Sequence, residues 1–153
     1  MSKQNENTEV IKNRTLVILG ASAGLAVGTL FAFTPNASAA PHRFTADIEG
    51  SNEVPGPGDP KASARATVTV DDATNRVCVA TVGNIWWPDT TEYHIHQGAA
   101  GATGGVVVDF MDRYDTCVTA DQATVAGIIA NPNGYYINVH TKNHPGGAAR
   151  GQL

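Results

Sequence analysis

Three histidines occupy alternating positions in segments that are typical of β-strands. His94 and His96 flank Ile95 in the run EYHIH, and His140 follows Val139 in the run YYINVHT. Alternate side chains of a strand point to the same face, so His94 and His96 should carry their imidazoles on one face, about 7 Å apart. Two imidazoles at that spacing can bind one metal ion.

His140 has the parity to join this pair. In its segment the apolar side chains Ile137 and Val139 should face a core, which turns His140 to the opposite face. His144, four residues further on in a turn, is a candidate fourth ligand. Three or four imidazoles suit copper or zinc, and a square arrangement of nitrogens favours Cu(II). The alternative is that these histidines only form hydrogen bonds that order the sheet surface.

Arg150 has the parity to point to the same side as His140. It could attract an anion toward a metal ion. It could also pair with Glu53, in the segment EVPGPG, and pin that loop to the sheet. We favour the loop-pinning role, because guanidinium and carboxylate groups pair well.

Other chemistries have weaker support. No G-x-S-x-G motif occurs in the expected mature domain, residues 40–153, and no nucleophile lies beside a base there, which disfavours a hydrolase. Asp109, Asp112 and Asp115 lie close together, but their spacing lacks the Gly and Glu of a calcium loop, so a solvated acidic rim is expected.

The first 39 residues have the features of a secretory signal peptide. A polar start with lysines precedes an uncharged apolar run, residues 16–33, and the small-x-small sequence Ala37-Ser38-Ala39 follows. An uncleaved anchor is the alternative, since the run is just long enough to span a bilayer. We therefore expect a mature domain, residues 40–153, that is secreted or held in the cell envelope without a membrane span.

Cys78 and Cys117 are the two cysteines of the chain. Each lies in a β-like run, they are far apart in sequence, and no C-x-x-C motif is present. In an oxidising compartment such a pair is expected to form a structural disulfide.

The remaining pattern predicts an all-β domain. The expected strands alternate with turn signals, a shorter extended piece covers residues 113–118, and residues 119–130 have the spacing of one short helix. About seven strands at regular spacing indicate an antiparallel Greek-key β-sandwich. The expected strands are residues 41–49, 64–70, 76–82, 91–96, 106–110, 135–141 and 149–153.

The charge pattern limits the partners. The formal net charge is −4 and the charges are scattered, with no basic patch. Nucleic acid and anionic membrane surfaces are therefore poor partners.

Three segments resemble the CHRD (chordin-type) domain family. They are EGSNEVPGPG at 49–58, HIHQGAAGATGGVVV at 94–108 and YYINVHTKNHPGGAARGQL at 135–153. The resemblance covers essentially all of the expected mature chain. It implies a secreted module without an established general enzymatic activity, whose partner would be an extracellular protein or a component of the cell envelope.

A second similarity is to copper-zinc superoxide dismutases, which are also Greek-key sandwiches with an H-x-H strand. It implies that His94, His96 and His140 are copper ligands and that Arg150 is an anion guide. The chain lacks the long loop that holds zinc in those enzymes, so this similarity implies copper binding rather than a full dismutase site.

These observations lead to two main hypotheses. The first is a non-enzymatic CHRD-type binding or envelope-associated module, and the alternative is a copper-binding, redox-active protein that uses the histidines. A ligand groove around Trp86, Trp87 and Tyr136 is a third possibility, which rests on aromatic composition alone.

Overall fold

The computed structural model describes residues 40–85 and 89–153 of the chain. The predicted signal peptide, residues 1–39, and both Trp86 and Trp87 lie outside these described residues. Within them, no helix has both the length and the apolar character needed to cross a membrane.

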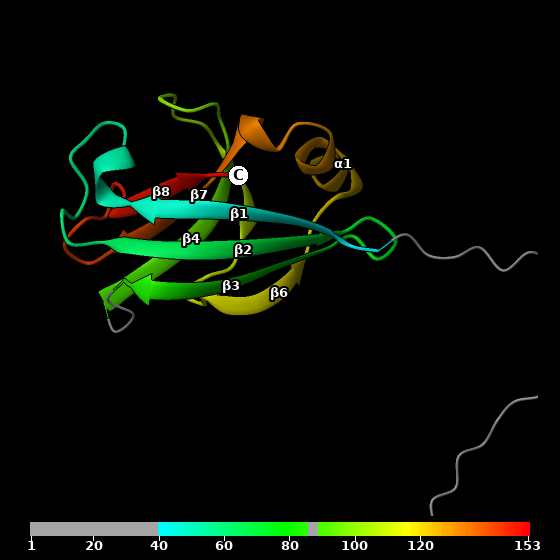
Figure 1. Ribbon diagram of the computed structural model, residues 1–153, viewed down its shortest axis with the longest axis horizontal. Coiled ribbons are helices and arrows are strands. Elements are labelled where there is room, and N and C mark those ends of the chain that lie inside the picture. Colours follow the sequence, from blue (N-terminus) through cyan, green and yellow to red (C-terminus); the bar gives the residue numbers. More distant parts are fainter. Residues whose placement is uncertain (1–39, 86–88) are drawn as a thin grey trace, which may run out of the picture. The chain divides into compact units, whose positions relative to one another are not determined.

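The described domain is an antiparallel β-structure with one α-helix (Figure 1). Its eight strands form a single sheet in the order β5-β4-β7-β8-β1-β2-β3-β6. The strands are β1 (His42–Glu49), β2 (Ser63–Asp71), β3 (Arg76–Asn84), β4 (Thr90–Gln97), β5 (Val106–Asp109), β6 (Asp115–Thr119), β7 (Tyr135–Thr141) and β8 (Ala149–Gln152). The helix is α1 (Gln122–Ala130), and the short 3-10 turns are η1 (Gly50–Asn52) and η3 (Pro132–Gly134).

The sheet is continuous because β8 pairs with β7 on one side and with β1 on the other. The all-β antiparallel class and the helix agree with the sequence prediction. The architecture differs from two separate sheets of about seven strands, since β4 and β7 pass behind β1, β2 and β3 within one curled sheet (Figure 1). The additional strand is β6, in the segment predicted only as a short extended piece.

Strand alternation builds one aliphatic core inside the curled sheet. Along β2, every second residue from Ala64 to Val70 is buried, as expected for a strand with one face inward. The fully buried side chains include Ile48, Val68, Val70, Val77, Val79, Tyr93, Ile95, Ile137 and Val139.

Helix α1 adds Val125 and Ile128 to this core. It begins after Asp121, whose carboxylate accepts a hydrogen bond of 2.8 Å from the backbone N–H of Thr124. The sequence Asn131-Pro132 ends the helix, as predicted.

The chain itself links the two edges of the sheet. Residues 110–114 connect β5, at one edge, with β6, at the other. Phe110 lies in this link, is buried, and places its ring 5.9 Å from that of Tyr93 on β4. The Tyr93 hydroxyl lies 2.7 Å from Oγ1 of Thr81 on β3. Burial raises the pKa of Tyr93, so the hydroxyl keeps its proton. This contact joins β4 to β3, and each of these strands lies next to an edge strand of the sheet.

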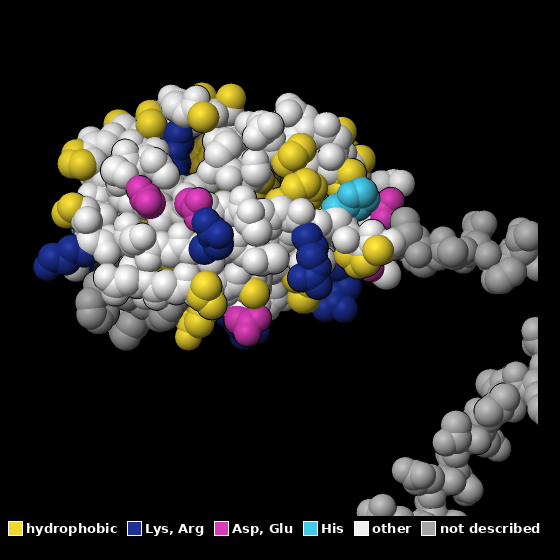
Figure 2. Space-filling model, in the orientation of Figure 1, with side chains coloured by type: hydrophobic (Ala, Val, Ile, Leu, Met, Phe, Trp, Pro, Cys, Tyr) yellow, Lys and Arg dark blue, Asp and Glu magenta, His cyan; other side chains and the backbone are white. Residues whose placement is uncertain are grey.

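Basic and acidic side chains are interspersed on the face formed by β1, β2 and β3 (Figure 2). Asp47 and Arg65 lie opposite each other on β1 and β2 and form an exposed ion pair of 2.7 Å. Because this pair is exposed to solvent, it contributes little to stability.

Cys78 and Cys117 form a disulfide between β3 and the edge strand β6, where they are partners in register. We expect the Cys78→Ser/Cys117→Ser variant to lose about 4 kcal/mol of unfolding free energy, since the bond closes a long loop in the unfolded chain. Urea denaturation measures this loss. Wild-type protein treated with a thiol reductant should unfold at the same urea concentration as the variant, and equal midpoints for oxidised wild type and variant would contradict the expectation.

Candidate metal centre

The three predicted histidines lie on the outer face of β4 and β7. The pairing places Ile95 opposite Ile137 inside the core, and the alternation turns His94, His96 and His140 outward. Two of these outward side chains are largely covered, since His94 is 7% exposed and His96 is 9% exposed, whereas His140 is half-buried. The cover comes in part from the small-residue loop at 98–105, whose Gly104 carbonyl bonds to His96.

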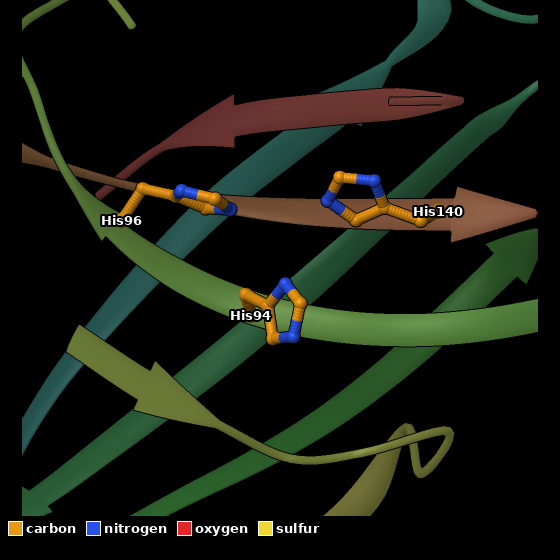
Figure 3. A group of neighbouring side chains, drawn as sticks. All are labelled: His94, His96 and His140. Atoms are coloured by element: carbon orange, nitrogen blue, oxygen red, sulfur yellow. The ribbon is translucent and has the colours of Figure 1, made fainter. Parts of the chain in front are cut away.

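The structure brings the three imidazoles together (Figure 3). Their ring centroids are 5.5 Å apart for His94 and His96, 5.3 Å for His94 and His140, and 6.1 Å for His96 and His140. Each residue offers one ring nitrogen, and these nitrogens all lie within 4.8 Å of one another. The rings therefore face a common space above β4 and β7.

Each imidazole has one nitrogen engaged with an acceptor. Nδ1 of His96 lies 2.9 Å from the Gly104 carbonyl oxygen, and Nδ1 of His140 lies 3.0 Å from that of Pro145. Carbonyl oxygens only accept, so both Nδ1 atoms carry the proton. Nε2 of His94 lies 3.4 Å from a carboxylate oxygen of Asp109, its register partner on β5.

The second nitrogen of each ring is left as a bare acceptor. Nδ1 of His94, Nε2 of His96 and Nε2 of His140 are buried, and none has a hydrogen-bond partner among the described residues. Buried polar atoms are normally satisfied, so three such atoms facing one space are unusual. Metal-binding histidines show this pattern, in which an outer acceptor orients each ring and fixes its tautomer.

Electrostatics keep two of the rings neutral. Burial lowers the pKa of His94, against the opposing effect of Asp109, and burial likewise lowers the pKa of His96, against the opposing effect of the Gly104 bond. A metal ion binds the neutral imidazole, so this environment favours the binding-competent form.

His144, the fourth candidate, is not part of the group of neighbouring nitrogens. It lies in the turn between β7 and β8, where its backbone N–H donates to Oγ1 of Thr141 at 3.1 Å. The structure thus gathers three of the four candidate histidines and places the fourth in a turn.

Arg150 and Glu53 both hold the loop that follows β1, but through different partners. Arg150 is 4% exposed and donates from Nε to the Asn52 carbonyl at 2.8 Å. The Glu53 carboxylate accepts a hydrogen bond from Nδ2 of Asn138, in the centre of β7. Gly147 leaves the space for this carboxylate, since a Cβ there would lie 2.4 Å from it.

Two contributors to the site were missed at the level of sequence, Asp109 and Gly104, and Tyr136 was named there only for an aromatic groove. Asp109 belongs to the expected acidic rim, but its register position opposite His94 makes it that ring's partner. The Tyr136 ring lies parallel to His96 at 4.9 Å. The sequence does carry a signal for Asp109. The H-x-H strand is followed by a second strand that ends in this aspartate, and antiparallel pairing of the two strands brings the end of the second strand toward the start of the first.

The family model of the CHRD domain matches residues 44–153, from β1 to the end of β8. The chain belongs to the CHRD domain family. The match includes His94, His96, His140 and Arg150, so the candidate centre lies inside the CHRD domain. No curated protein and no solved structure matches the sequence.

Asn138 provides a test of the buried polar contacts beside the histidines, because its side-chain amide donates to the Glu53 carboxylate. Burial raises the pKa of Glu53, and the hydrogen bond from Asn138 opposes this rise. In Asn138→Leu the buried carboxylate loses that donor, and we expect a loss of about 3 kcal/mol of unfolding free energy at pH 7. Without that donor the pKa of Glu53 in the folded state rises further. The unfolding free energy of the variant should therefore fall as pH rises through this folded pKa, and its deficit relative to the wild type should shrink at lower pH.

Urea denaturation at several pH values measures both effects. The matched control is Asn133→Leu, because Asn133 is exposed in η3 and should tolerate the change. Equal losses in the two variants, or a loss in Asn138→Leu that does not vary with pH, would contradict this view of Glu53.

Proposed function

We propose that this CHRD domain is a binding module that holds one transition-metal ion, copper or zinc, through His94, His96 and His140. The observation that carries the proposal is that each of these three grouped histidines keeps one buried ring nitrogen without a hydrogen-bond partner. One ring nitrogen from each of them lies within 4.8 Å of the others. Leaving such an acceptor unsatisfied costs about 1–3 kcal/mol, and a metal ion would satisfy all three at once.

The donor set favours these two metals. Imidazole nitrogens suit copper and zinc, whereas magnesium and calcium prefer oxygen ligands. Thiolate ligation is not available, because the described cysteines are joined in the disulfide.

The geometry needs only a small adjustment to hold an ion. Nitrogens bound to one zinc ion lie at about 2.0–2.1 Å from it, so two of them can be at most about 4.2 Å apart. The separations of up to 4.8 Å therefore require the rings to close by less than about 1 Å. Three protein ligands would leave a position open for a further small ligand, as in metal sites that are not purely structural.

We place this module outside the cytoplasm, either secreted or in the cell envelope. The disulfide between Cys78 and Cys117 supports an oxidising compartment, and the signal-like sequence at residues 1–39 supports export. Its partner would then be an extracellular protein or an envelope component.

Calorimetric titration of the metal-free protein tests the proposal. We expect one equivalent of Cu(II) or Zn(II) to bind with a sub-micromolar dissociation constant, which corresponds to about −8 kcal/mol or better. His96→Ala should weaken binding by more than about 100-fold, because losing a ligand costs more than losing an outer-shell partner. Metal at 100 times its dissociation constant should raise the unfolding free energy by about 2.7 kcal/mol in the wild type.

His42→Ala is the matched control, since His42 begins β1 outside the histidine group and should leave the affinity unchanged. His144→Ala shows whether the turn histidine contributes. Absence of binding by the wild type, or equal losses in His42→Ala and His96→Ala, would contradict a three-histidine centre.

A further inference from the structure

The small-residue loop at 98–105 is fixed in place rather than being the loose connection that its composition indicates. The backbone N–H of Gln97 donates to the Gly105 carbonyl at 3.0 Å, which closes the base of the loop. Gly98 donates to the Gly134 carbonyl at 2.8 Å, and Nε2 of Gln152 donates to the Gly98 carbonyl at 3.0 Å. These bonds hold the ends of the loop but leave its middle to other contacts.

Gly104 is the point at which this loop meets the histidines. Its carbonyl accepts the Nδ1–H of His96, and its N–H donates to the Tyr136 hydroxyl at 3.2 Å. A Cβ at this position would lie 1.6 Å from the Gln97 carbonyl oxygen, so the backbone approaches as closely as it does only because the residue is glycine. The position of the Gly104 peptide therefore sets which nitrogen of His96 is left bare.

Arg150 holds the middle of the same loop. Its Nη1 donates to the Ala102 carbonyl at 2.8 Å, while its Nε donates to the Asn52 carbonyl in the loop after β1. The guanidinium carbon also lies 4.4 Å from the centre of the Tyr136 ring. The Tyr136 ring also stacks on His96, so it lies between His96 and Arg150. The arginine therefore contacts the histidine through the loop and through this ring.

We propose that Arg150 is a positioning residue for His96: by fixing the loop at Ala102 it holds the Gly104 carbonyl on Nδ1–H and leaves Nε2 of His96 directed at the shared space. The effect on the tautomer stands without a metal, whereas the effect on metal affinity rests on the proposed function. The rigid fork of a guanidinium suits two carbonyls that come from separate loops, and a lysine ammonium lacks that shape.

The experiment compares wild type with Arg150→Met, which keeps an unbranched side chain about as long as the aliphatic stem of arginine and removes the guanidinium donors. Long-range 1H–15N NMR of the metal-free protein reports which nitrogen of each histidine carries the proton. In the wild type His96 should be protonated on Nδ1. In Arg150→Met we expect His96 to lose this preference, while His140, held by the Pro145 carbonyl, keeps its own. Calorimetry should show Cu(II) or Zn(II) affinity reduced about 10- to 100-fold, the usual effect of losing an outer-shell partner.

Two further variants complete the design. Arg65→Met removes an exposed arginine of β2 and should change neither readout. Gly104→Ala displaces the carbonyl directly, so it should reproduce the tautomer change with Arg150 intact, and it provides the test if Arg150→Met does not fold.

The outcomes separate the two proposals. A changed His96 tautomer in Arg150→Met supports the positioning role, even if the wild type binds no metal and the proposed function fails. An unchanged tautomer with unchanged affinity overturns the positioning role, even if the wild type binds metal tightly. If Arg150→Met does not fold, an unchanged tautomer in Gly104→Ala overturns it as well.

Discussion

The antiparallel pairing of β4 with β7 is the constraint on which the rest of the structure depends. It sets Ile95 opposite Ile137 and Tyr93 opposite Val139, which gives the core a continuous apolar wall. The same register turns the histidines of both strands to the outer face. A slip of one residue would exchange the two faces and put imidazoles into the core, so the hydrophobic pattern fixes the geometry of the polar site.

The outer face of this pairing is a second buried layer, built from polar groups. Asn138 is 3% exposed and Arg150 is 4% exposed, although both point away from the aliphatic core. Polar groups in such a layer are stable only when they are paired, and most of them are bonded to loop carbonyls or to each other. Among the described histidines, His94, His96, His140 and His144 each keep one buried ring nitrogen without a partner. The first three also lie close together, and this grouping is what distinguishes them from histidines that merely order a surface.

Much of this site follows from the sequence, because strand parity is a local property. The period of two in EYHIH and YYINVHT places His94, His96 and His140 on one face, and two cysteines in β-like runs predict the disulfide. The sheet was harder to predict, since its continuity depends on the short strand β8 pairing on both sides.

The cover over the histidines could not be predicted in the same way. A loop of glycine, alanine and threonine carries no periodic signal, and its course is set by distant partners such as Arg150. The role of Asp109 depends on the register between β4 and β5, which contains an irregularity between Ile95 and His96. The tautomers of the histidines depend on these tertiary contacts, so they became apparent only with the fold.

X-ray absorption at the metal edge, on protein loaded with one equivalent of Cu(II) or Zn(II), tests the central claim most directly. The account predicts a first shell that contains three imidazole nitrogens at about 2.0 Å, with the multiple-scattering signature of histidine rings and no sulfur. A shell with fewer than three imidazoles, or one made of oxygen ligands alone, would contradict it.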